Sequence, residues 1–124
     1  MLGSMPMNGF VPVKDGDKAR AFYEGVLGFE LISDNEWVAT YRVGANKIML
    51  QKGAGADFKP DRRTIVGWEI AGIRDVVDEL TKRGVVFEHF EWMEQDDHGI
   101  WNSPDGKVAW FKDPDGNTLS VSEH

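Results

Sequence analysis

The chain has 124 residues, of which 41% are hydrophobic and 28% are charged, a balance that is typical of globular proteins and argues against disorder. It has no cysteine, which excludes disulfides and thiolate metal sites, and no apolar run approaches the roughly 20 residues of a membrane-spanning helix. The net charge of −7 disfavours nucleic acid as a partner, because phosphate binding needs a basic face, and suits a neutral or cationic ligand.

The start of the chain has no charged segment followed by an apolar one, so the sequence predicts a cytoplasmic protein with no membrane partner. We expect residues 1–7 to be an added or disordered leader. The rest, residues 8–124, is predicted to form a single domain of two modules, over 8–52 and 64–122, joined by a linker of glycines and charged residues over 53–63.

The first module is predicted to begin with a strand over residues 8–13 and a helix over 17–27. Apolar side chains in that helix recur at the i, i+3, i+4, i+7 and i+8 spacing of one helix face. Asp15 or Asp17 is expected to cap the start of the helix, and Gly28 to end it in the left-handed conformation. Three strands complete the module, and they are predicted over residues 29–33, 37–43 and 47–51.

The second module repeats this order. A strand is predicted over 64–70, and a helix over 72–83 is expected to end at Gly84, which lies 56 residues after Gly28. A duplicated strand–helix–strand–strand–strand unit predicts an α+β fold, with a curved mixed sheet around a cleft in which small molecules bind. The remaining segments are predicted as strands over 85–93, 107–112 and 118–122, a polar loop over 94–104 and an Asp-Pro-Asp-Gly turn over 113–116.

Two segments carry a resemblance to a known superfamily. Residues 21–29 read AFYEGVLGF, and residues 108–117 read VAWFKDPDGN. Together with the duplicated order over residues 8–122, these segments make the chain similar to the vicinal oxygen chelate superfamily, which includes glyoxalase I, bleomycin-resistance proteins and extradiol-type dioxygenases. The resemblance implies a fold of two βαβββ modules and a homodimer.

The same resemblance indicates where metal ligands would lie. Members that are metalloenzymes place ligands at positions that correspond here to Asn8, Met49, Ile65 and Ser120. A divalent ion that activates oxygen ligands needs imidazoles and carboxylates, and none of the four residues supplies one. We therefore expect no metal or other cofactor. The alternative is an unorthodox metal site built from His89, His98 and the acidic residues near them, which are Glu91, Glu94, Asp96 and Asp97.

Strand alternation separates a core face from a cleft face, because side chains repeat every two residues. Val11, Val13, Ile48 and Leu50 are expected in the core, so the residues between them face the cleft. The same reasoning for the second module, with one tryptophan from the polar loop, completes a set of candidate ligand-binding residues: Asn8, Phe10, Met49, Gln51, Glu69, Trp101 and Ser120.

Two members of this set allow a sharper interpretation. Glu69 is the one carboxylate on the predicted cleft face, so it is either a general base or counter-ion or a solvated residue at the rim. Trp101 either stacks on a ligand or a second subunit, or it packs within its loop. Of the other tryptophans, Trp68 is predicted in the core, and packing in the core or on the sheet is also predicted for Trp37, Trp92 and Trp110.

Three classes of function follow from these observations. The first is a protein that binds a small, planar or cationic molecule without a metal, as drug-sequestering bleomycin-resistance proteins do. The second is a metal-dependent lyase or dioxygenase with displaced ligands, and the third is a regulatory domain that binds a partner protein. No catalytic residue is assigned, and the first class is the one that the missing ligands and the tryptophans favour.

Overall fold

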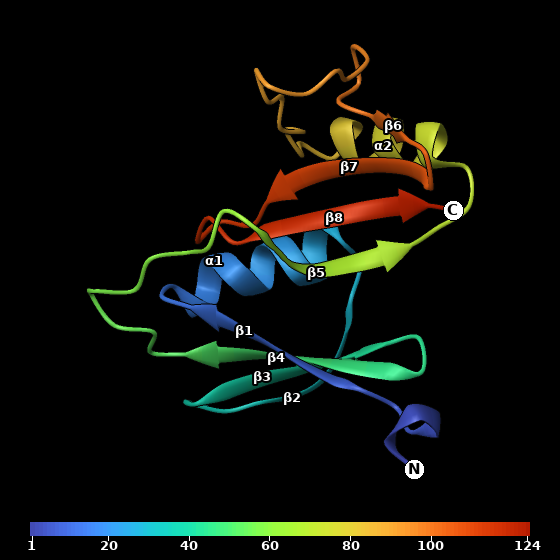
Figure 1. Cartoon of the computed structure of the whole chain (residues 1–124). Coiled ribbons are helices and arrows are strands. Elements are labelled where there is room, and N and C mark those ends of the chain that lie inside the picture. Colours follow the sequence, from blue (N-terminus) through green and yellow to red (C-terminus); the bar gives the residue numbers. More distant parts are fainter. The chain divides into compact units, whose positions relative to one another are not determined.

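The protein is described from a computed structural model that covers residues 1–124. The chain divides into two compact units, Met1–Lys59 (unit 1) and Pro60–His124 (unit 2), and each is described by itself (Figure 1). No helix in either unit combines the length and the apolar character that crossing a membrane requires.

Unit 1 contains a four-stranded sheet in the order β1-β4-β3-β2, in which β1 is parallel to β4 and the other pairs are antiparallel (Figure 1). A short 3₁₀ helix, η1, precedes the sheet, and the helix that follows β1 packs on β4. The bounds in chain order are η1 (Leu2–Ser4), β1 (Asn8–Val13), α1 (Gly16–Arg20), η2 (Ala21–Val26), β2 (Glu30–Asp34), β3 (Val38–Val43) and β4 (Asn46–Lys52).

The helix of unit 1 begins and ends within one residue of the predicted bounds. The Asp15 side chain accepts hydrogen bonds from the backbone N–H groups of Asp17 and Lys18, both at 3.1 Å, which satisfies two donors that have no partner within the helix. Gly28 follows the last turn with a φ of 77°, as expected for a left-handed helix end. The second half, η2, differs from the expectation because it is wound as a wider π-helix rather than an α-helix.

Unit 2 has the same architecture. Its sheet has the order β5-β8-β7-β6, with β5 parallel to β8, and α2 packs against β7 and β8 (Figure 1). The repeated strand order confirms the prediction of an α+β fold with two βαβββ-like modules. The bounds are β5 (Thr64–Glu69), α2 (Ile73–Lys82), β6 (Trp101–Ser103), β7 (Gly106–Lys112) and β8 (Thr118–Glu123).

The predicted strand over residues 85–93 is wrong. Only one isolated bridge forms there, between Phe87 and Phe111, and the second strand of the module is β6, within the segment predicted as a loop. The Gln95 side chain explains the difference. Its Oε1 accepts from the backbone N–H of Phe90 at 2.7 Å, and its Nε2 donates to the carbonyl oxygens of Glu88 and Gly99 at 2.9 and 2.8 Å. A side chain therefore takes backbone groups that a strand would use for pairing.

The cores of both units follow the predicted strand faces. In unit 1, Val11 and Val13 are fully buried, and Ile48 and Leu50 lie in the core with them. In unit 2, Leu119 and Val121 are buried against the face of the sheet that α2 covers. Further core residues are Ala19, Tyr23, Ala39 and Tyr41 in unit 1 and Ile73, Val77, Val85, Phe87, Ile100, Ala109 and Phe111 in unit 2.

The tryptophans depart from their predicted packing. Trp37 and Trp92 are 70% and 74% exposed, so the prediction that they pack in the core or on the sheet is wrong. Both lie outside the regular alternation of a strand, Trp37 in the β2–β3 turn and Trp92 in the irregular segment after Phe87, where no sheet neighbour covers them. Trp68 is half-buried, and its ring stacks on Phe111 with centroids 6.3 Å apart.

Candidate functional site

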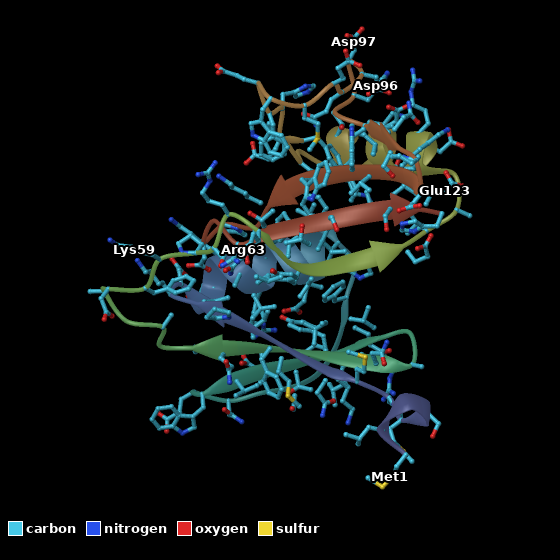
Figure 2. The ribbon with its side chains drawn as sticks, in the orientation of Figure 1. Met1, Lys59, Arg63, Asp96, Asp97 and Glu123 are labelled. Carbon is cyan, nitrogen blue, oxygen red and sulfur yellow. The ribbon has the colours of Figure 1, made fainter.

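Unit 2 contains a cavity of about 610 Å³. It lies beside the face of the sheet that points away from the core, because Trp110 and Lys112 line it and alternate along β7 with the buried residues Ala109 and Phe111. The segment that leads into β5 forms another part of the wall, and Figure 2 shows Arg63 in that segment. All of the lining residues belong to unit 2.

One wall of the cavity is aromatic. Phe90, Trp92 and Trp110 line it together with Met93. The Phe90 ring stands at 78° to the Trp110 ring with centroids 5.8 Å apart, and it lies 5.4 Å from the Trp92 ring. Trp101 does not line the cavity but supports the wall, because its ring lies 6.1 Å from that of Trp110 at a tilt of 32°. These rings form a continuous apolar surface of the kind that binds flat molecules.

The orientation of Trp110 is fixed by a hydrogen bond. Its indole Nε1 donates to the Thr64 hydroxyl oxygen at 2.9 Å, which links β7 to β5 across the intervening strand β8. A β-bulge between Thr64 and Val66 places Thr64 opposite Thr118, in the row of residues on the cavity side of the sheet. Because the Thr64 hydroxyl already accepts the indole N–H, an apolar ligand can cover the Trp110 ring without leaving that N–H unpaired.

Charged side chains form the rest of the lining. Arg63 pairs with Asp61 through two contacts, Nε–Oδ1 at 3.0 Å and Nη2–Oδ2 at 2.8 Å, and its backbone N–H also donates to Oδ1 at 2.8 Å. The hydrogen bonds from Arg63 lower the pKa of Asp61 to about 2. Lys112 Nζ lies 3.2 Å from Glu88 Oε1, whereas Arg62 forms no ion pair in the structure.

The candidate residues of unit 1 share one face of its sheet, as the sequence predicts. Phe10 and Met49 are directly paired between β1 and β4, and Asn8 and Gln51 lie two residues away on the same face. Phe10 is 53% exposed, and Asn8 and Gln51 are exposed as well.

The candidate residues of unit 2 also lie on the cavity side of their sheet, but none of them lines the cavity. Ser120 is buried between Gly67 and Trp110 in the sheet register, so it is a neighbour of the wall. Glu69 is engaged elsewhere: its carboxylate accepts from the backbone N–H of His124 at 2.9 Å and contacts His124 Nδ1 at 2.6 Å. These hydrogen bonds lower the pKa of Glu69.

Sequence reasoning did not find most of the cavity residues. Arg62 and Arg63 belong to the predicted linker, and Phe90 and Trp92 belong to the strand that does not form. Trp110 could have been found, because counting outward from the Asp-Pro-Asp-Gly turn places it opposite Ser120, a residue predicted on the cleft face.

The positions at which the superfamily places metal ligands do not form a suitable donor set in this chain. Asn8 and Met49 lie in unit 1 and offer an amide and a thioether, while Ile65 and Ser120 lie in unit 2 and offer a hydrocarbon and a hydroxyl. His98 Nδ1 lies 2.9 Å from Asp78 Oδ1. No cluster of three or more histidine and carboxylate side chains is arranged to hold a metal ion.

The sequence model of the Glyoxalase/Bleomycin resistance protein/Dioxygenase superfamily matches residues 7–121, and the chain belongs to this superfamily. The match covers both units, which agrees with the duplicated strand order of the two sheets. No curated protein sequence matches the chain.

Solved structures show the same fold at low sequence identity. TnmS3, an antibiotic binding protein from a Streptomyces species, is 23% identical with a TM-score of 0.74, over 99% of this chain and 98% of that one. A superfamily member from Sphaerobacter thermophilus is 23% identical with a TM-score of 0.75, and both chains are covered completely. Lactoylglutathione lyase from Agrobacterium tumefaciens is 20% identical with a TM-score of 0.69, over 97% of this chain and 93% of that one.

Proposed function

We propose that this protein binds a planar small molecule in the cavity of unit 2 and that binding needs no metal ion. The observation that carries the proposal is the aromatic wall of Phe90, Trp92 and Trp110, with Trp110 held in place by Thr64. The cavity volume of about 610 Å³ falls within the range of roughly 300–1,000 Å³ that is usual for small-molecule sites.

Stacking supplies the binding energy in this proposal. A flat ligand that covers Trp110 removes apolar surface from water and adds the preference of aromatic rings for offset or edge-to-face contact, worth about 0.5–1.5 kcal/mol for each pair beyond the area buried. Trp92 belongs to the same wall and is 74% exposed, so its ring is accessible to a ligand as well. The aromatic side chains of the wall can make contacts with a ligand but do not react with it, so we propose binding rather than catalysis.

The solved relatives support more than one class of function within this fold. One of the proteins with this fold is an antibiotic binding protein, which agrees with binding of a planar compound. Another is a lactoylglutathione lyase, an enzyme. The donor set at the superfamily's metal positions favours the first class for this chain, because Met49 and Ile65 cannot hold a hard divalent ion.

Titration with 2-naphthalenemethanol, followed by tryptophan fluorescence and calorimetry, tests the proposal. We expect saturable binding to the protein, unchanged after dialysis against EDTA. Trp110→Ala should weaken binding by about tenfold or more, which corresponds to about 1.4 kcal/mol. Trp37→Ala is the matched control, because Trp37 is an exposed tryptophan in unit 1, and it should leave the affinity unchanged.

Two results would overturn the proposal. Equal loss of affinity in Trp110→Ala and Trp37→Ala would show that the ligand does not occupy this cavity. Loss of binding on EDTA treatment, restored by a divalent ion, would favour a metal-dependent function with displaced ligands instead. Thr64→Val provides a milder variant that keeps the ring and removes only the acceptor of the indole N–H.

A further inference from the structure

The charge of the cavity is opposite to that of the unit around it. Unit 1 has seven lysines and arginines and seven aspartates and glutamates, so the whole net charge of −7 belongs to unit 2, which has seven basic and fourteen acidic residues. The cavity, however, is lined by three of those seven basic residues and by only two of the fourteen acidic ones. Basic side chains are therefore concentrated at the one cavity with an aromatic wall.

The two acidic residues of the lining are already occupied. Asp61 accepts three hydrogen bonds from Arg63, and Glu88 pairs with Lys112. An ammonium group has more donors than this single contact uses, and a guanidinium has five donors in a planar fork. Lys112 and Arg62 therefore keep donors that can bind an anion, and each of the two carboxylates already has a basic partner within the lining.

Local contacts hold the basic segment next to the wall. The Thr118 hydroxyl donates to the carbonyl oxygen of Asp61 at 3.3 Å, which ties the segment to the start of β8. Lys112 is paired with Thr118 in the register of β7 and β8, and the backbone N–H of Glu88 donates to the Trp110 carbonyl oxygen at 2.8 Å. The basic groups and the indole ring thus border the same cavity from elements that are hydrogen-bonded to one another.

We propose that the ligand of this cavity is a planar aromatic anion, an aryl carboxylate, whose ring lies on Trp110 and whose carboxylate contacts Arg62 and Lys112. The inference rests on the proposed function of the cavity and adds the charge of its ligand. It differs from the expectation of a cationic ligand, which follows from the net charge of the whole chain and from Glu69, a residue outside the lining.

A set of three probes with one ring system and different charges tests this proposal. The probes are 2-naphthoate, 2-naphthalenemethanol and 2-naphthylmethylamine, which are anionic, neutral and cationic at pH 7. We expect 2-naphthoate to bind about tenfold more tightly than the neutral probe, since the two partly exposed ion pairs contribute up to about 1 kcal/mol each. The preference should decline at high salt, because added ions screen exposed charges.

Variants then locate the anion. Arg62→Gln and Lys112→Gln should each reduce the affinity for 2-naphthoate by about threefold to fivefold and leave the affinity for the neutral probe unchanged. Lys107→Gln is the matched control, since it makes the same change of charge on β7 outside the cavity and should have no effect.

The outcomes separate this inference from the proposed function. Equal binding of all three probes, or tighter binding of the amine, would overturn the anionic ligand and leave the stacking site in place. Failure of all three probes to bind would contradict the proposed function itself. A loss of 2-naphthoate affinity in Lys107→Gln as large as that in Arg62→Gln would show a general effect of protein charge and would also overturn the inference.

Discussion

Removal of the Asp113 carboxylate should strongly destabilise unit 2, and the structure gives the size of the effect. Asp113 begins the Asp-Pro-Asp-Gly turn between β7 and β8 and is only 5% exposed. Its Oδ1 accepts from the backbone N–H groups of Asp115 and Asn117, and its Oδ2 accepts from Asn117 Nδ2, each at 2.9 Å. The turn therefore depends on one carboxylate for at least these three hydrogen bonds.

In Asp113→Ala, both Asn117 donors lose this acceptor at a residue that is 1% exposed. A buried donor that loses its acceptor costs about 1–3 kcal/mol, and the Asp115 N–H, which is only partly buried, costs less because water can reach it. We therefore expect a loss of about 3–5 kcal/mol in the free energy of unfolding. Asp113→Asn keeps one oxygen acceptor and the side-chain shape, so its cost should be about 1–2 kcal/mol.

Urea unfolding followed by circular dichroism measures these differences. Asp105→Ala is the control, since Asp105 is an exposed aspartate in the tight turn between β6 and β7 and its loss should cost less than about 0.5 kcal/mol. If Asp113→Ala destabilises the protein no more than Asp105→Ala does, the reasoning about the turn is wrong. Asp113→Asn keeps the comparison measurable if the alanine variant does not fold.

Two further predictions concern stability. Glu24 accepts hydrogen bonds from Arg20 at 2.6 Å and from the Tyr41 hydroxyl at 2.8 Å, and the Arg20 contact lowers its pKa below the ordinary value of 4.5. An acid whose pKa is lower in the folded state stabilises the fold above its unfolded pKa, and this stabilisation declines as the pH falls toward the folded pKa. Glu24→Gln should therefore lower the melting temperature most at pH 7 and progressively less below pH 4.5, and an effect that does not change with pH would contradict this. Gly67→Ala should lower the free energy of unfolding by about 1–3 kcal/mol, because its Cβ would lie 2.6 Å from the Ser120 hydroxyl oxygen. Adding Ser120→Ala should restore most of this stability in the double variant. If the melting temperature of the double variant does not recover, the clash is not the cause.

The features that could be predicted from the sequence are those with local causes. The helix stops at Gly28 and Gly84 follow from the need for positive φ, and both residues have it, at 77° and 97°. The buried faces of β1 and β4 follow from strand alternation around Val11 and Leu50. Each of these patterns lies within a few consecutive residues, so it can be recognised from a single sequence.

The features that could not be predicted depend on contacts between distant or irregular segments. No strand forms at residues 85–93 because the Gln95 side-chain amide binds backbone groups of that segment. The spacing of apolar residues in the sequence does not show that a side-chain amide will replace a neighbouring strand as the hydrogen-bond partner. The cavity depends on this irregular segment, on the bulge at Thr64 and on the packing of the residues before β5. The candidate residues of unit 2 therefore lie on the cavity side of their sheet, with Ser120 and Trp101 next to the wall, but the candidate set includes none of the lining residues.

The uneven distribution of aromatic residues gives each unit its own optical signal. Both tyrosines, Tyr23 and Tyr41, are buried in unit 1, while four of the five tryptophans belong to unit 2. The remaining one, Trp37, is 70% exposed, so its emission already resembles that of an indole in water and changes little on unfolding. A shift in emission wavelength therefore reports the melting of unit 2, and the near-ultraviolet dichroism of tyrosine reports that of unit 1. The protein thus carries natural probes that can show whether its two halves unfold together or one after the other.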